Sequence, residues 1–209
     1  MATSQANEFS STPQQAGPLT IDEISQLYEK QAAKPRFEGS ALGWRIAGYE
    51  ALLAEGIENP NPALSCEGRQ VGPDTKTDLD FEVGYLPGNL KVGPTSGPEK
   101  WLCGDRGFSV RYVFNVYGAL GNGQIVIERN TRSRRVLEMD IPNDSVSTGD
   151  INGTPSIFIH PADDETGLGL GRIVVIQKNT ETPFTVLSVM SDDAVPFAEL
   201  IRIAEGIKG

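Results

Sequence analysis

The sequence predicts an α+β domain with a mostly antiparallel β-sheet, and two observations carry this fold class. Strand-like stretches separated by turn residues fill most of the chain between residues 79 and 190. Stretches with helical spacing of apolar residues stand before and after that region. Strands joined by short turns pair as antiparallel hairpins, and helices that are segregated from strands indicate the α+β class.

The chain of 209 residues is long enough for one domain with a tail, and we expect a single globular domain over residues 19–209. Residues 1–18 are mainly small and polar, which predicts a disordered tail or tether. Thr20 is an N-cap candidate for an N-terminal helix, with Glu23 as its capping-box partner. This helix is expected to end before Pro35, because proline disfavours helical backbone at the preceding residue.

The middle of the chain is predicted to be mainly strands. Residues 39–56 fit either a helix or a pair of strands, with a helix favoured over residues 49–55. Residues 93–97 are expected to form a loop. Strands are predicted over residues 79–83, 90–92, 108–117, 124–128, 135–139, 156–160, 172–177 and 184–190. The stretch 108–117 is the clearest strand, because its apolar residues alternate over its whole length.

The C-terminal stretch predicts a second helix. Asp192 and Asp193 favour the start of a helix, where carboxylates interact well with the helix dipole, and Pro196 suits the first turn. The residues that would face the core are apolar and recur at helical spacing: Phe197, Leu200, Ile201, Ala204 and Ile207. We therefore expect one helix near each end of the chain, both packed on the sheet.

Charge and hydropathy exclude some partners. The formal net charge is −10, from 18 basic and 28 acidic residues, so the chain repels phosphate backbones and nucleic-acid binding is disfavoured. The sequence has no apolar run long enough to span a membrane, so membrane association would need a segment absent from it. The first residues lack the features of a signal peptide, and one hypothesis is that they are the cut edge of a longer precursor.

The two cysteines, Cys66 and Cys103, stand in polar, glycine-bearing surroundings. Free cysteines favour apolar surroundings, so a disulfide between them is favoured over two unrelated thiols. Disulfides rarely persist in a reducing cytosol, so this bond would place the protein in an extracytoplasmic compartment: secreted, periplasmic or at the cell surface. Two cysteines and one histidine lack the paired spacing of a zinc site, and no metal or other cofactor is predicted.

Three segments resemble a known family: residues 81–90, which contain Tyr85-Leu86-Pro87-Gly88, residues 151–155, and residues 184–189 with 197–205. They are similar to an uncharacterised bacterial domain at the extracytoplasmic end of anti-sigma-factor-like membrane proteins. The resemblance covers roughly residues 79–207, and residues 19–78 have no counterpart in it. Because that family is related to lipoprotein-carrier-like half-barrels, the resemblance implies a curved sheet. No catalytic residues are known for the family.

Two charged clusters are candidate binding sites. Asp78, Asp80 and Glu82 would share one strand face, which is a start for a cation site, although a solvated acidic surface is the favoured interpretation. Basic residues concentrate in one short segment, which could bind an anion or an acidic partner: Arg129, Arg132, Arg134 and Arg135. The simpler interpretation of this segment is a charged hairpin loop.

These observations favour a non-enzymatic sensing or protein-interaction domain of a bacterial envelope protein. His160 is the only histidine, and we expect it at a surface or a sheet edge, so no catalytic residue is assigned. Trp44 and Trp101 are expected in the core rather than in a binding platform. One alternative is a carrier that encloses a lipid or another small apolar ligand, and a second is a hydrolase that uses clustered carboxylates. The expected partner is therefore a protein or a small apolar molecule.

Overall fold

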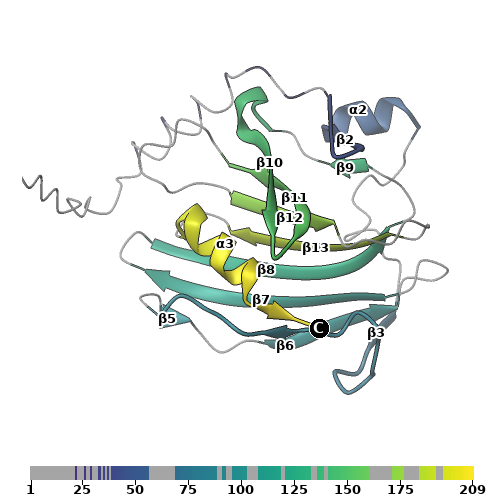
Figure 1. Ribbon diagram of the computed structural model, residues 1–209, viewed down its shortest axis with the longest axis vertical. Helices are drawn as coiled ribbons and strands as arrows, with labels where there is room; N and C mark the ends of the chain where they lie inside the picture. The colour runs from purple at the N-terminus through teal and green to yellow at the C-terminus, as the bar shows by residue number, and fades with distance from the viewer. Residues whose placement is uncertain are drawn as a thin grey trace, which may run out of the picture.

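A computed structural model gives the structure of the chain. It describes residues 39–56, 69–88, 91–92, 96–102, 108–118, 121–132, 136–138, 141–160, 171–176, 184–191 and 195–209, with the single residues 22, 26, 29, 33, 35 and 37. Within these residues the protein is mostly antiparallel β-sheet, as the sequence predicts (Figure 1).

The main sheet has nine strands in the described part of the chain. Eight of its strands follow one another across the sheet in this order: β10 (Val146–Ile151), β11 (Thr154–Ile159), β12 (Gly171–Ile176), β13 (Phe184–Ser191), β8 (Gly121–Arg132), β7 (Phe108–Gly118), β6 (Ser96–Leu102) and β3 (Arg69–Val71). A short strand, β5 (Lys91–Val92), also pairs with β7. All pairs in this sheet are antiparallel.

The hairpin between β10 and β11 shows why local sequence sets the register. Asn152 and Gly153 are its two turn residues, and both have positive φ, 51° and 80°. Asparagine and glycine tolerate this left-handed backbone well, and such a turn matches the twist of the flanking strands. Strand β10 is polar and has an apolar residue only at each end, so the sequence did not predict it.

The region 39–56, which fitted either helix or strands, contains both. A hairpin of β1 (Gly39–Ala41) and β2 (Trp44–Ala47) leads into helix α2 (Tyr49–Ala54). Strand β9 (Val136–Glu138) pairs in parallel with β2, which completes a separate three-stranded sheet. This parallel pair is an exception within the antiparallel class.

The C-terminal helix is confirmed as α3 (Phe197–Glu205), and it lies across the main sheet (Figure 1). After it, β14 (Ile207–Lys208) pairs with β4 (Glu82–Val83). Tyr85 follows β4, and its hydroxyl donates a hydrogen bond of 2.6 Å to Glu199 of α3. The segments around residues 81–88 and 197–208 therefore pack side by side although they are far apart in sequence. A 3₁₀ turn, η2 (Asn143–Ser145), precedes β10.

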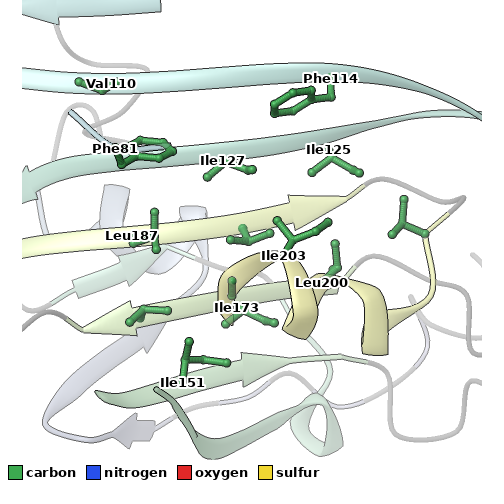
Figure 2. Packing of buried hydrophobic residues seen from close by; sticks show 14 of the residues in the cluster. Phe81, Val110, Phe114, Ile125, Ile127, Ile151, Ile173, Leu187, Leu200 and Ile203 are labelled. Carbon is green, nitrogen blue, oxygen red and sulfur yellow. The ribbon is translucent and has the colours of Figure 1, made fainter. Parts of the chain in front are cut away.

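The two faces of the main sheet carry separate cores. On the first face, alternate residues of β7, β8, β12 and β13 pack against α3 and the segment around Phe81 (Figure 2). Val110, Ile127 and Leu200 are fully buried there. On the second face, Trp44 and Ile46 of β2 pack against β11, β12 and β13. The prediction that Trp44 belongs to the core is confirmed, since it is 1% exposed.

Two predictions about local structure were wrong. Within the stretch 79–83, only Glu82–Val83 forms a strand, because Thr77 and Asp80 bond to each other and fix a turn. The predicted loop 93–97 overlaps β6, which begins at Ser96. Pro98 lies where the β6–β7 register shifts, and a proline within a sheet is tolerated at such an irregularity because it cannot donate to the ladder.

Most of the predicted N-terminal helix lies outside the described residues. Asp22, Gln26 and Glu29 are helical and exposed, but their neighbours are not described, so packing of this helix on the sheet stays a prediction. The predicted tail, residues 1–18, also lies outside the described residues. Among the helices that the structure describes, none is both long and apolar enough to cross a membrane.

Candidate functional site

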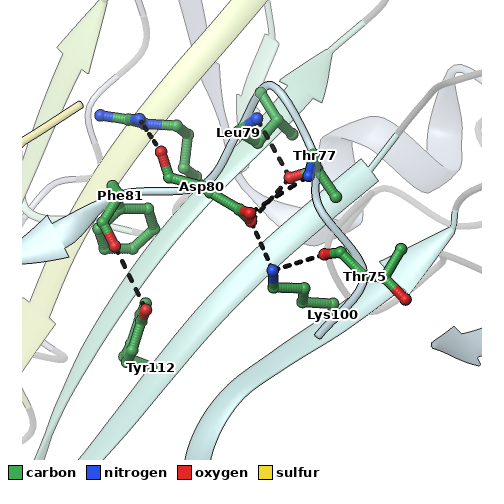
Figure 3. A network of polar contacts seen from close by, with 8 residues as sticks. Thr75, Thr77, Leu79, Asp80, Phe81, Lys100 and Tyr112 are labelled. Carbon is green, nitrogen blue, oxygen red and sulfur yellow. Dashed lines mark hydrogen bonds and ion pairs between the residues drawn. The ribbon is translucent and has the colours of Figure 1, made fainter. Parts of the chain in front are cut away.

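Lys100 lies on β6, the strand next to the edge strand β3, and ties the segment before β4 to the main sheet (Figure 3). Its ammonium group is 2.7 Å from Oδ1 of Asp80 and donates a hydrogen bond of 2.6 Å to the carbonyl oxygen of Thr75. Thr77 donates to both carboxylate oxygens of Asp80, from its backbone N–H and from its hydroxyl. The carboxylate of Asp80 is therefore engaged in holding a turn, and we assign it a structural role.

Asp80 gives this contact a pH dependence. Burial alone would raise the pKa of Asp80, but the hydrogen bonds from Lys100 and Thr77 outweigh burial and lower its pKa. A lowered folded-state pKa stabilises the protein above the ordinary aspartate pKa, and this contribution is lost as the pH falls through the folded-state value. The side chain of Asp80 is 39% exposed, so salt should weaken the contact.

We expect Asp80→Asn to lower the free energy of unfolding at pH 7, and the deficit relative to wild type to shrink below about pH 4. The measurement is denaturant unfolding of both proteins from pH 7 to pH 2. Asp78→Asn is the matched control, because Asp78 is exposed and carries the same charge. A deficit that stays constant down to pH 2 would contradict a role for the Asp80 charge.

The predicted cation site does not assemble. Asp78 and Glu82 are exposed, while Asp80 pairs with Lys100. No group of three acidic, cysteine or histidine residues in the described ranges is placed to hold a metal ion. The reason is the turn at residues 77–80, which replaces the strand on whose face the three carboxylates were expected to gather.

Arg129 of the predicted basic cluster lies inside the molecule, with 3% of its surface exposed. Its guanidinium donates to the carbonyl oxygens of Asp80 and Gly209, at 3.2 and 2.9 Å, and lies 5.0 Å from the ring centroid of Phe81. Burial lowers the pKa of Arg129. This arginine therefore joins β8 to the C-terminal segment on the first face of the sheet.

The side chains of the other three arginines of that cluster are not described. Arg132 ends β8. Its side chain, like Arg134 and Arg135, lies outside the described residues. Anion binding by this segment therefore stays a prediction.

The cysteines Cys66 and Cys103 also lie outside the described residues, so the disulfide stays a prediction. The strands nearest to them in sequence are neighbours, because β3 pairs with β6 and Arg69 stands opposite Leu102. Cys103 follows Leu102 directly, and Cys66 precedes Arg69 by three residues.

A group of polar side chains lies on the second face of the main sheet, beside the core around Trp44. We call it the polar strip, and its members are Ser109, Arg111, Glu128, Asn130, Arg172 and Ser188. The register puts Arg111 opposite Glu128, and Glu128 opposite Ser188. Directly opposite residues in an antiparallel pair project on the same side, so these side chains cross β7, β8 and β13 as one row.

Glu128 is the centre of the polar strip and is 5% exposed. Its Oε1 accepts hydrogen bonds from the Ser109 hydroxyl at 2.9 Å and from the Asn130 amide at 2.8 Å. No described residue donates to Oε2. A carboxylate has about four acceptor positions, so Glu128 keeps unused acceptor capacity at Oε2, an atom that is not fully buried.

Two arginines flank this carboxylate. The Nε of Arg111 is buried and has no hydrogen-bond partner, and within the described residues no ion pair joins Arg111 to Glu128. Arg172 reaches across from β12 and donates to the Ser188 hydroxyl at 3.3 Å. The strip thus places cations and a carboxylate side by side without pairing Arg111 and Glu128.

Sequence reasoning missed the polar strip. The available signal was the second set of alternating positions on β7 and β8, where Ser109, Arg111, Glu128 and Asn130 interrupt an apolar pattern. Polar residues at alternate positions usually indicate a solvent-facing side of a sheet. Their burial, and the neighbours that β13 and β12 bring to them, require the sheet order.

His160 directly follows β11, a strand inside the sheet, and its ring centroid is 4.4 Å from that of Phe197 on α3. Its backbone N–H donates to the carbonyl oxygen of Ser145 at 2.8 Å. These contacts assign His160 a packing role. Comparison of the chain with known protein families, curated proteins and solved structures gives no match.

Proposed function

We propose that this chain is a non-enzymatic binding domain that works outside the reducing cytoplasm, as the sensing or protein-interaction part of a bacterial envelope protein. The observation that carries the binding role is the polar strip, where Arg111 lies opposite Glu128 and its Nε is buried without a hydrogen-bond partner. Buried polar groups in native proteins are nearly always satisfied, so such groups call for a ligand, a partner or ordered water.

The packing of the first face favours this proposal over an apolar carrier. A carrier needs inward-facing apolar residues that are left unfilled. Val110, Ile127 and Val189 on this face are fully buried, and they belong to the same core cluster as α3. The extracytoplasmic part of the proposal is supported by the approach of β3 to β6, whose ends lie next to Cys66 and Cys103 in sequence.

The test combines binding and turnover on the full chain produced in an oxidising compartment. We expect a class of polar small molecules to raise the melting temperature in a saturable way, because a ligand that binds only the folded state stabilises it. Esters, glycosides and phosphate esters should be left unchanged by the same preparation. Hydrolysis that disappears in Glu128→Gln would overturn the non-enzymatic role and establish the carboxylate hydrolase alternative.

A further inference from the structure

We infer that the polar strip binds a small zwitterion of the α-amino-acid type, with its ammonium group on Glu128 and its carboxylate on Arg111. This inference rests on the proposed binding function and names its ligand class. The two residues stand directly opposite each other on β8 and β7. Directly opposite residues have Cα atoms about 4.5–5.5 Å apart, so one small molecule can reach both side chains.

The carboxylate of Glu128 is suited to bind a cationic hydrogen-bond donor. Both groups that bond to Oε1, the Ser109 hydroxyl and the Asn130 amide, are neutral. A buried carboxylate is costly unless it is paired and hydrogen-bonded, and the described residues supply no cation within ion-pair distance. An ammonium group carries up to three donors with a positive charge, which matches the unused Oε2.

The guanidinium of Arg111 is suited to bind an anionic hydrogen-bond acceptor. Its Nε is buried without a partner, and the described residues give its guanidinium no hydrogen bond. A guanidinium presents donors in a planar fork that matches the two oxygens of a carboxylate. An anion that uses Nε and one terminal nitrogen would satisfy the group that the protein leaves unbonded.

The two requirements together select the ligand. A simple anion would bond to Arg111 but would approach the carboxylates of Glu128 and of Glu99, which stands opposite Arg111 on β6. A simple cation would be repelled by Arg111. A molecule with ammonium and carboxylate groups on one carbon offers each residue its opposite charge within one small ligand. Arg172, held by Ser188 at the other side of Glu128, adds a second cation to the strip.

The experiment is isothermal titration of the full chain with glycine and L-glutamate, and with acetate and methylammonium as single-charge probes. We expect saturable binding of at least one amino acid, at least tenfold tighter than either single-charge probe. Arg111→Gln and Glu128→Gln should each weaken that binding tenfold or more. Arg202→Gln is the matched control, because Arg202 is an exposed arginine on α3, away from the strip, and should leave the affinity unchanged.

Circular dichroism and thermal unfolding check that each variant is folded. If a charge variant fails to fold, Ser109→Ala replaces it, since it removes one donor to Oε1 and should weaken amino-acid binding by a smaller factor. The inference is overturned if no amino acid binds, if acetate binds as tightly as glycine, or if the variants bind like wild type. The proposed function has a separate test. Hydrolysis of an ester, glycoside or phosphate ester that is lost in Glu128→Gln would contradict it, whatever the amino-acid titrations show.

Discussion

Replacing Leu200 with alanine is expected to lower the free energy of unfolding by about 2–5 kcal/mol. Leu200 is fully buried and belongs to the core cluster of the first sheet face (Figure 2). The loss combines the transfer free energy of the removed carbons with the cavity that they leave. Denaturant unfolding measures it, and Glu205→Ala on an exposed position of α3 is the control, expected within about 0.5 kcal/mol of wild type.

A substitution at Gly171 of β12 tests the packing of Leu200 against the sheet in a second way. A Cβ added at Gly171 would lie 2.7 Å from Cδ1 of Leu200 and 2.9 Å from the ring of Phe197. Gly171→Ala alone should therefore destabilise the protein by about 1–3 kcal/mol through overpacking. In the Leu200→Ala background the contact with Leu200 is relieved and only that with Phe197 remains, so the combined loss should be smaller than the sum. Additive losses would mean that α3 does not pack on β12 as the structure has it.

The parts of the fold that were predicted correctly are those in which local pattern and tertiary burial agree. Val110, Phe114 and Val116 alternate along β7, and all three are buried on one face. Leu200, Ile203 and Ala204 recur at helical spacing and are the buried residues of α3. In both elements the period of the apolar residues fixes the face that meets the core, so no knowledge of neighbouring elements is needed.

The features that the sequence did not predict depend on side-chain hydrogen bonds that compete with strand formation, or on contacts with elements that are distant in sequence. Asp80 lies within an alternating stretch, but its bonds with Thr77 and Lys100 hold a turn in place of a strand. Arg129 stands in a basic run, yet it is on the same face of β8 as Ile127 and its long side chain reaches two carbonyl groups. Charge runs usually indicate solvated surface, so only the structure separates this arginine from its neighbours in sequence.

The polar strip marks the limit of sequence reasoning about the site. Alternation assigns Arg111 and Glu128 each to a face of its own strand, but their meeting depends on the β7–β8 register. Arg172 comes from a strand that is two places away from β8 in the sheet. A ligand that bridges such residues is therefore inferred from sheet order rather than from spacing along the chain.

A disulfide between Cys66 and Cys103 is expected to contribute about 3–4 kcal/mol to stability, because it restricts the unfolded chain. The pairing of Arg69 with Leu102 supports it, since each cysteine is within three residues of this pair in sequence. The Cα atoms of disulfide-bonded cysteines lie about 4.4–6.8 Å apart, so the bond requires the two cysteines to be close neighbours. The bond would fasten β3, the edge strand, to β6.

The measurement is a thiol titration of the denatured protein, purified without reductant from an oxidising compartment. We expect no free thiols, and two after reduction. Reductant should lower the midpoint of denaturant unfolding in wild type and leave a Cys66→Ser/Cys103→Ser double variant unchanged. Two free thiols in the unreduced protein would contradict the disulfide. The main support for an extracytoplasmic location would then be lost, but the proposal for the polar strip and its amino-acid test would not be affected.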